Sequence, residues 1–235
     1  AIGGVGYQAL LELAKLRENI QPHHSEVTGN RNILLDPEKL KYALDQLVLS
    51  HRVELLLHTT LVQVKKQDSH LQAIDLVDLF QQKSLSGTAF VDATGNGQLA
   101  RFAGLPCRVN QQEKHFQSMS LPIRLGGLPK DLTIDREAIK AAVAVYNQQA
   151  VYTIPRQDGG VFMRVPNSND WLWMIVDLGL SDIREDLVTK AEWMGRKIAN
   201  DCVAVLRSEV TGFEHCHIVN TGPQIGIREA WRPVA

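Results

Sequence analysis

The sequence predicts an α/β arrangement for its first hundred residues and an α+β arrangement for the region that follows. Residues 1–108 contain two segments with helical apolar spacing, then β-branched runs and a glycine-containing turn, whereas residues 109–222 alternate strand and helix patterns. The chain has 235 residues, of which 44% are hydrophobic and 22% are charged. This length and composition suffice for one large domain or two small ones.

Two helices are expected in the first fifty residues. Residues 7–18 carry apolar side chains close to helical spacing, and a second helix follows Asp36 and Pro37. Asp is a favoured helix N-cap and Pro fits the first helical position, so the start of the second helix is well defined. The apolar faces consist of Leu10, Leu11, Ala14 and Leu16 in the first helix, and of Leu40, Ala43, Leu44 and Leu47 in the second.

Extended segments follow the two helices. Residues 53–67 and 71–80 are rich in β-branched and apolar side chains and are separated by a short polar stretch, which predicts a hairpin. Residues 81–87 are interpreted as a turn that leads into a third strand over residues 88–93. That strand ends at the glycines of residues 94–97.

The second region is predicted to combine strands and helices. A strand within residues 116–129 ends at glycines, and residues 133–150 form a helix. Two strands within residues 160–179 flank a turn at residues 167–170, and a last strand lies within residues 215–222. Between them, a long amphipathic helix is indicated by Val188, Ala191, Gly195, Ile198, Cys202 and Leu206.

Charge and cysteine content exclude several classes of partner. The formal net charge of −1 gives no basic surface for nucleic acid or an anionic membrane. No apolar run approaches the roughly 20 residues of a membrane span. Cys107, Cys202 and Cys216 are odd in number and widely spaced, which favours a reducing compartment, so a cytoplasmic protein is expected. The oligomeric state stays open.

The stretch TAFVDATGNGQLARFAG, residues 88–104, is the first candidate for chemistry. Phe90 and Val91 are expected in a buried strand, and the glycines allow the backbone to approach a ligand closely. A helix beginning near Gln98 would then present free N–H groups to a polar or anionic group. The alternative is an ordinary strand–turn–helix in which the glycines serve only turn geometry. The stretch is not the G-x-G-x-x-G dinucleotide fingerprint, and residues 1–8 lack the preceding strand that this fingerprint needs.

Several segments taken together resemble the FAD-dependent oxidoreductase family of glutathione-reductase-like two-domain flavoproteins. The most specific are DATGNG and GIREAWR, where the family usually has an acidic residue after the first glycine and reads G-[IV]-R-E-[TS]-R-R. Asn96, Ala230 and Trp231 depart from these patterns, and Trp231 replaces an expected arginine. The segments that carry the resemblance are residues 35–48, 53–64, 90–104, 116–127 and 223–233.

The resemblance implies an incomplete FAD-binding domain with an inserted antiparallel-sheet substrate domain. Residues 1–108 would be part of the FAD-binding domain, residues 109–222 the substrate or cap domain, and residues 223–235 the return into the FAD-binding domain. The family holds FAD with three separated pieces of chain, of which the middle one is present here. The chain is therefore expected to be a fragment that is inactive in isolation, does not retain FAD by itself and purifies colourless.

The resemblance also implies site residues and a reaction, in which hydride passes between FAD and an unidentified small-molecule substrate. Arg228 and Glu229 would act near the flavin or the substrate, because a guanidinium holds anionic oxygens in a fixed fork. Without the resemblance, these two residues read equally well as a salt-bridged turn. The implied FAD contacts are Leu61, Val62, Asp92, Ala93, Thr94, Gly95, Asn96 and Gly97.

Alternatives remain open at this stage. His215 and His217 would share a face of a strand, but no further ligands follow at a recognisable spacing, so no metal site is predicted. Trp171, Trp173 and Trp193 could line a substrate cavity, although alternate aromatic residues in strands are more often core. A cofactor-free binding or interaction module on the same fold, and a flavin monooxygenase or halogenase, are alternative functions.

Overall fold

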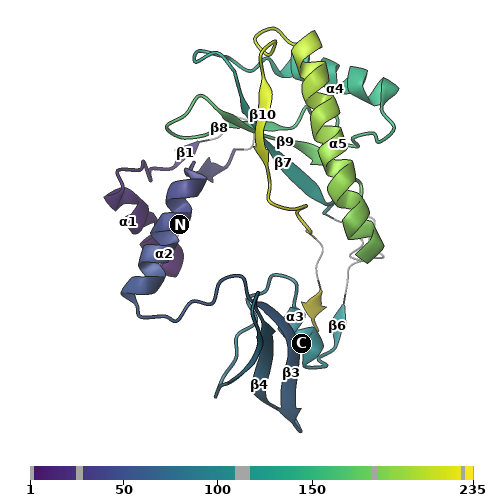
Figure 1. Cartoon of the computed structure of the whole chain (residues 1–235). Coiled ribbons are helices and arrows are strands. Elements are labelled where there is room, and N and C mark those ends of the chain that lie inside the picture. Colours follow the sequence, from purple (N-terminus) through teal and green to yellow (C-terminus); the bar gives the residue numbers. More distant parts are fainter. Residues whose placement is uncertain (1–2, 25–28, 109–116, 181–184, 229–230, 235) are drawn as a thin grey trace. The chain divides into compact units, whose positions relative to one another are not determined.

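The structure, a computed structural model, is a mixed α/β arrangement of helices and antiparallel sheets (Figure 1). It describes residues 3–24, 29–108, 117–180, 185–228 and 231–234. None of the helices in these ranges is both long and apolar enough to cross a membrane.

The chain divides into two compact units, which are described separately below. Unit 1 comprises Ala1–Leu55, Ser120–Gly179 and Lys190–Gly226, and unit 2 comprises Leu56–Met119, Leu180–Thr189 and Ile227–Ala235. This division differs from the expected domains in that the first 55 residues group with the second region. The last residues group with the region of the glycine turn. The assignment of FAD-binding and substrate roles to these segments stays a prediction.

Two helices form a small core at the start of unit 1. Helix α1, Gly4–Lys15, packs on helix α2, Pro37–Ser50, through the buried side chains of Leu10, Leu13 and Ala43. Asp36 is the N-cap of α2, as predicted: its carboxylate accepts hydrogen bonds from the backbone N–H groups of Glu38 at 2.9 Å and Lys39 at 3.4 Å. Between the helices, β1, His23–His24, pairs antiparallel with β2, Arg31–Asn32.

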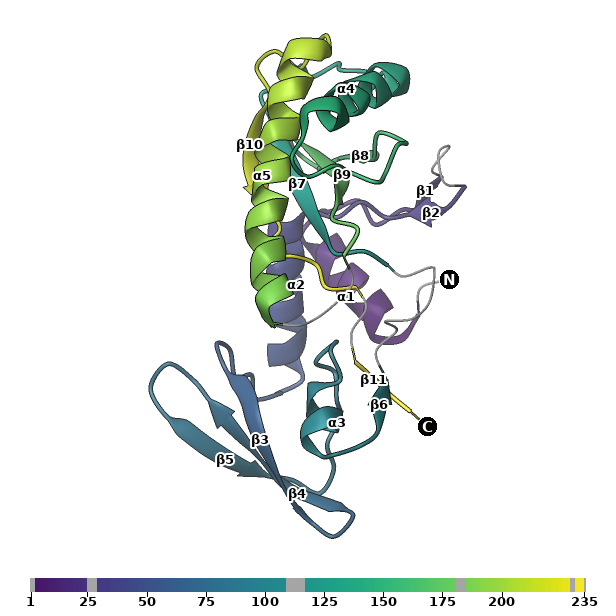
Figure 2. The ribbon, with the colours of Figure 1, turned by 90° about the vertical axis from the view of Figure 1, so that its right-hand side faces the viewer.

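A four-stranded antiparallel sheet is the centre of unit 1. Its strand order is β10-β7-β9-β8, and the predicted strands and helices of this region are confirmed. Helices α4 and α5 lie together on one side of it (Figures 1 and 2). The elements are β7, Ser120–Gly126; α4, Arg136–Gln149; β8, Val161–Arg164; β9, Trp171–Asp177; α5, Glu185–Glu209; and β10, His217–Thr221.

The two faces of the sheet differ in burial because side chains alternate along each strand. On β7, Ile123 and Leu125 are fully buried, as is Trp173 on β9. Helix α5 packs closely on β7: a Cβ added to Gly195 would lie 3.3 Å from Leu121 Cδ2. Arg124 on β7 and its cross-strand neighbours on the other face are only half-buried. That second face is therefore available to line a cavity.

Unit 2 contains a three-stranded antiparallel sheet in the order β3-β4-β5 (Figure 2). The predicted hairpin is confirmed as β3, Thr60–Gln67, and β4, His70–Val77. The prediction of a turn over residues 81–87 is wrong, because β5, Gln82–Ser86, pairs with β4. Asp78 explains the difference: its carboxylate accepts from the backbone N–H groups of the two residues before β5, which reverses the chain tightly.

The strand predicted over residues 88–93 is not formed. Val91, expected to be buried, is 88% exposed, and Phe90 is half-buried. A strand needs a neighbour that satisfies its backbone groups, and no strand in the described part of the chain pairs with this segment. The segment instead leads in an irregular conformation to helix α3, Gln98–Phe102.

The end of the chain returns to the region of the glycine turn within unit 2. Strand β6, Cys107–Arg108, pairs antiparallel with β11, Arg232–Pro233. A further backbone hydrogen bond of 2.8 Å runs from Val234 N–H to the carbonyl oxygen of Pro106. These contacts place residues 231–234 beside α3 and the turn that precedes it.

Candidate functional site

The glycine turn before α3 has a left-handed backbone at two positions. Gly95 has φ of +75° and Gly97 has φ of +60°, conformations that favour glycine. The reasons for glycine differ between them. A Cβ at Gly97 would lie 2.8 Å from the carbonyl oxygen of Trp231, whereas a Cβ at Gly95 would meet no atom of the described residues within 4 Å. Gly97 is therefore required by the close approach of Trp231, and no described residue occupies the space beside Gly95.

The side chain of Asp92 joins this turn to helix α3 through hydrogen bonds. Its carboxylate accepts from Thr94 N–H at 3.0 Å, from Thr94 Oγ1 at 2.7 Å and from Ala100 N–H at 3.0 Å. Thr94 Oγ1 in turn accepts from Gln98 N–H at 3.0 Å. The expectation that α3 presents free N–H groups to a ligand is wrong, because Asp92 and Thr94 already cap its first turn.

The hydrogen bonds also set the charge of Asp92. Burial alone raises the pKa of this carboxyl, but the hydroxyl of Thr94 and the backbone N–H groups of Ala100, Thr94 and Leu99 outweigh it and hold the pKa below its usual value. Asp92 is therefore ionised at neutral pH. Its negative charge is directed at the turn and the helix start.

The structure brings two of the predicted cofactor-binding segments together. Gln98 Nε2 donates to the carbonyl oxygen of Leu61 at 3.0 Å, which ties α3 to β3. The pairing of β3 with β4 shifts register between Leu61 and Gln63, so Val62 occupies a β-bulge and its side chain is 39% exposed. Ala93, Gly95 and Asn96 are exposed in the same unit.

A cavity of about 600 Å³ in unit 2 is lined by residues on either side of the turn, Asp92 and Leu99, but not by the turn residues 94–97. Asp92 and Phe90 line it together with β3 and β4 residues, and Lys66 at its edge donates to the carbonyl oxygen of Ala103 at 2.7 Å. Among the described residues, the backbone N–H groups of Gly95 and Asn96 have no acceptor. Open N–H groups at a left-handed glycine fit a polar or anionic group of a ligand, although neither Gly95 nor Asn96 lines this cavity.

The other predicted reaction residues are only partly described. Arg228 is exposed, and its Nη2 donates to Gln117 Oε1 at 3.4 Å. No hydrogen bond or ion pair joins Arg228 to residues 92–97 in the described part of the chain. Glu229 and Ala230 lie outside the described residues. The roles of Arg228 and Glu229 therefore stay predictions.

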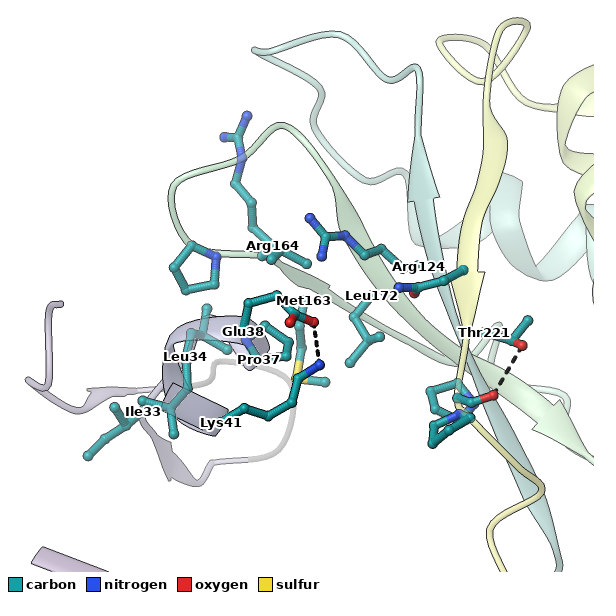
Figure 3. Close-up of a pocket in the computed structure, with 17 residues that line it drawn as sticks. Ile33, Leu34, Pro37, Glu38, Lys41, Arg124, Met163, Arg164, Leu172 and Thr221 are labelled. Carbon is teal, nitrogen blue, oxygen red and sulfur yellow. Dashed lines mark hydrogen bonds and ion pairs between the residues drawn. The ribbon is translucent and has the colours of Figure 1, made fainter. Parts of the chain in front are cut away.

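Sequence reasoning missed a cavity of about 700 Å³ in unit 1 (Figure 3), which we call the substrate pocket after the role proposed for it below. It lies between the start of α2 with residues 33–35 and the sheet face opposite α4 and α5. Arg124 and Leu172 line it from cross-strand positions on β7 and β9. The alternation of Pro122 and Arg124 with the buried apolar residues of β7 was the available signal for such a face.

Charged side chains line the substrate pocket from both sides. From the sheet, Arg124 Nε and Nη2 each lie 2.7 Å from Asp170 Oδ2. From α2, Lys41 Nζ lies 2.7 Å from Glu38 Oε1, and both side chains point towards the sheet side of the pocket in Figure 3. The pocket therefore combines two ion pairs with otherwise largely apolar walls.

The aromatic and histidine candidates lie elsewhere. Trp173 is fully buried in the core and donates from Nε1 to the carbonyl oxygen of Gly159 at 2.9 Å. Trp171 is half-buried, Trp193 is 45% exposed, and neither lines the substrate pocket. His215 and His217 are exposed, and no group of three or more His, Cys, Asp or Glu side chains is arranged for a metal within the described ranges.

Comparison with known proteins adds one finding to this geometry. The protein-family model described as FAD dependent oxidoreductase matches residues 1–235. The comparisons with curated proteins and with solved structures gave no match.

Proposed function

Because the chain belongs to the FAD dependent oxidoreductase family, we propose that residues 61–62 and 92–97 contact FAD and that the substrate pocket holds the molecule that is oxidised or reduced. A flavin-linked redox function follows from the family itself. The bound cofactor would supply a ring that accepts or donates hydride, and the chain would supply binding, orientation and charge. The glutathione-reductase-like architecture with an inserted substrate domain belongs to this proposal.

The observation that carries the cofactor assignment is the open position at Gly95. Its left-handed backbone costs an ordinary residue about 1–2 kcal/mol, yet no atom of the described residues lies within 4 Å of its Cβ position. A ligand at this position would require glycine for a second cause besides turn geometry, because any side chain would occupy the space of the ligand. Asp92 and Thr94 then act as positioning residues that hold the turn in its shape, since their polar groups are already paired within the chain.

The β-bulge at Val62 supports the second cofactor contact. A bulge leaves one residue without a ladder partner, so its backbone groups are available to another molecule. The bond from Gln98 to the carbonyl oxygen of Leu61 fixes this bulge relative to α3. In the proposal, the backbone of Leu61 and Val62 contacts the adenine end of FAD.

Arg228 and Glu229 remain proposed reaction residues. Arg228 is exposed and makes a hydrogen bond to an amide oxygen rather than an ion pair in the described part of the chain. Its guanidinium therefore retains donors for an anionic group of the substrate or a flavin carbonyl. We also propose a cytoplasmic protein that acts on a small molecule and has no nucleic-acid or membrane partner.

A cofactor-free binding module on the same fold is the second candidate. It is favoured by the internal pairing of Asp92, Thr94 and Gly97, which leaves fewer polar groups for a cofactor than the sequence predicted. The two candidates differ in whether the chain recognises FAD at all.

Titration of the chain with FAD and with riboflavin, followed by flavin fluorescence anisotropy, tests the proposal. We expect saturable binding of FAD that is too weak to survive purification, and weaker binding of riboflavin because it lacks the adenine end. Equal anisotropy changes for the two flavins, or no saturation with FAD, would favour the cofactor-free module. A heat-unfolded sample of the same chain provides the baseline for non-specific flavin adsorption.

A further inference from the structure

We infer that the substrate pocket binds a carboxylate with an apolar body, and that Arg124 holds the carboxylate. This inference rests on the proposed function only for the statement that the ligand of this pocket is the substrate. The binding preference itself follows from the lining of the pocket in unit 1.

The walls of the pocket are mostly apolar. On the side of α2 they include Ile33, Leu34 and Pro37, and on the side of the sheet they include Met163 and Leu172 (Figure 3). A cavity of about 700 Å³ is large enough for a ligand of many non-hydrogen atoms. Burial of apolar ligand surface against these side chains favours a ligand with an apolar body.

Arg124 is fixed in place within this apolar surrounding. Its Nε donates to Asp170 Oδ2, Nη2 forms an ion pair with the same oxygen, and its side chain is only 22% exposed. The guanidinium has five N–H groups, so it retains donors for another acceptor. In Figure 3 the guanidinium extends from β7 towards the α2 side of the pocket. A pre-positioned guanidinium of this kind matches the geometry of a carboxylate.

The lining itself holds more cationic than acidic side chains, although Asp170 pairs with Arg124 from outside the lining. Arg124, Lys41 and Arg164 are the cations that line the pocket, and Glu38 is the acid. Asp170, the partner of Arg124, is not part of the lining. Lys41 and Glu38 form an exposed pair, with side chains 68% and 71% exposed, which contributes little stability and yields readily to a ligand.

Arg164 differs from Arg124 in orientation although both line the pocket. Its guanidinium points away from the other labelled side chains in Figure 3. It donates to the carbonyl oxygen of Lys130, and its Cζ lies 5.6 Å from the centre of the Trp171 ring. The inference therefore assigns the carboxylate to Arg124 and not to Arg164.

Binding of 3-phenylpropanoate and of the isosteric 3-phenylpropanamide to the full chain tests this inference. The two probes share an apolar body and differ in charge, so their affinity ratio isolates recognition of the carboxylate. Ligand-observed NMR titration is suited to weak ligands of this size. We expect the acid to bind about tenfold more tightly than the amide, because hydrogen bonds to charged groups are stronger than neutral ones. Equal affinities would overturn the inference.

Three variants identify the residue responsible. Arg124→Gln is expected to abolish the preference for the acid and to leave amide binding unchanged, whereas Arg164→Gln is expected to keep the preference. Arg196→Gln removes an arginine of α5 that pairs with Glu192 and lies outside the pocket lining, which controls for net charge. Retention of the preference in Arg124→Gln, or its loss in Arg196→Gln, would contradict the assignment.

A folding defect is anticipated for the first variant, because Arg124→Gln leaves Asp170 without its partner. The double variant Arg124→Gln/Asp170→Asn removes both charges and is expected to show the same loss of preference in a folded chain. Failure of this inference is distinct from failure of the proposed function. The probe titration needs no flavin. If the chain binds FAD but does not prefer the acid, only the inference about Arg124 fails. If the chain prefers the acid but does not bind FAD, only the proposed redox role fails.

Discussion

The guanidinium carbon of Arg101 lies 4.3 Å from the centre of the Trp231 ring. Arg101 belongs to α3 and Trp231 to the returning end of the chain, so this cation–π contact holds the two together within unit 2. Trp231 stands at a position where the resemblance described in the sequence analysis led us to expect an arginine. The structure gives this departure a physical reason: an arginine at position 231 would face the like charge of Arg101, whereas an indole attracts it.

Replacement of Trp231 tests this contact. Trp231→Ala is expected to lower the free energy of unfolding by about 1–2 kcal/mol, through loss of the cation–π contact and of half-buried indole surface. Trp231→Arg is expected to destabilise the chain at least as much at low salt, and less at high salt because the repulsion is screened. Urea unfolding at two salt concentrations measures both effects. Equal stability of Trp231→Arg and the parent would contradict the account.

Alanine at each of the two left-handed glycines separates turn geometry from close packing. Gly95→Ala is expected to cost about 1 kcal/mol of unfolding free energy, because only its backbone conformation is unfavourable for alanine. Gly97→Ala is expected to cost about 1–3 kcal/mol more, because its Cβ would also collide with the carbonyl oxygen of Trp231. Denaturant unfolding of the two variants compares them directly. The reverse order would show that the turn packs differently.

The loop around Asp158 predicts a pH dependence of stability in unit 1. Arg156 donates to both carboxylate oxygens, at 2.5 and 2.8 Å, and lowers the pKa of Asp158 from 3.8 to about 2. A carboxyl whose pKa is depressed in the folded chain contributes stability above its unfolded pKa. That contribution is lost as the pH falls through about 4 to about 2. The pair is partly exposed, so solvent screening keeps the contribution small.

Asp158→Asn provides the test of this pH dependence. The variant is expected to be less stable than the parent at neutral pH, and the difference is expected to shrink as the pH falls below about 4. Emission of Trp173 can report the loop, because its indole N–H donates to the carbonyl oxygen of Gly159. A constant difference between variant and parent from pH 7 to pH 2 would contradict the pairing.

Local signals in the sequence predicted most helices and the antiparallel strands of unit 1. Asp36 before Pro37 predicts the start of α2, and the three- and four-residue spacing of apolar residues predicts α5. Each pattern involves only residues that lie within one or two helical turns of one another. The strands around the turn at residues 167–170 are likewise defined by their own alternation and by turn residues. Such elements depend little on what lies far away in the chain.

The incorrect predictions concern segments whose structure depends on partners. The apolar run at Phe90 and Val91 has the composition of a strand, but a strand also needs a neighbouring strand, and none pairs with it among the described residues. The polar residues of β5 lack a strand-like composition, yet pairing with β4 orders them. The substrate pocket was missed for the same reason, since α2 and the sheet are far apart in sequence.

The candidate cofactor-binding residues come from the sequence, and the differences between them could be seen only in the structure. Gly95 and Gly97 look equivalent in the motif, and only the structure separates an open position from one that the carbonyl oxygen of Trp231 fills. Asp92 and Thr94 were expected to contact the cofactor, which stays a prediction, and the structure adds that their side chains also cap α3. Side-chain hydrogen bonds of this kind depend on the exact path of the turn, which residue types alone do not define.

FAD affinity of Gly95→Val, compared with that of Gly29→Val, tests the central claim most directly. Gly29 is a matched control, because it too has a left-handed backbone, with φ of +68°, and no atom within 4 Å of its Cβ position among the residues that the structure describes. Both variants are therefore expected to lose similar stability. We expect Gly95→Val to weaken FAD binding per folded molecule by at least about tenfold, since the branched side chain would occupy cofactor space, and Gly29→Val to leave it unchanged. Equal FAD affinity in Gly95→Val and the parent would show that the turn serves only the fold.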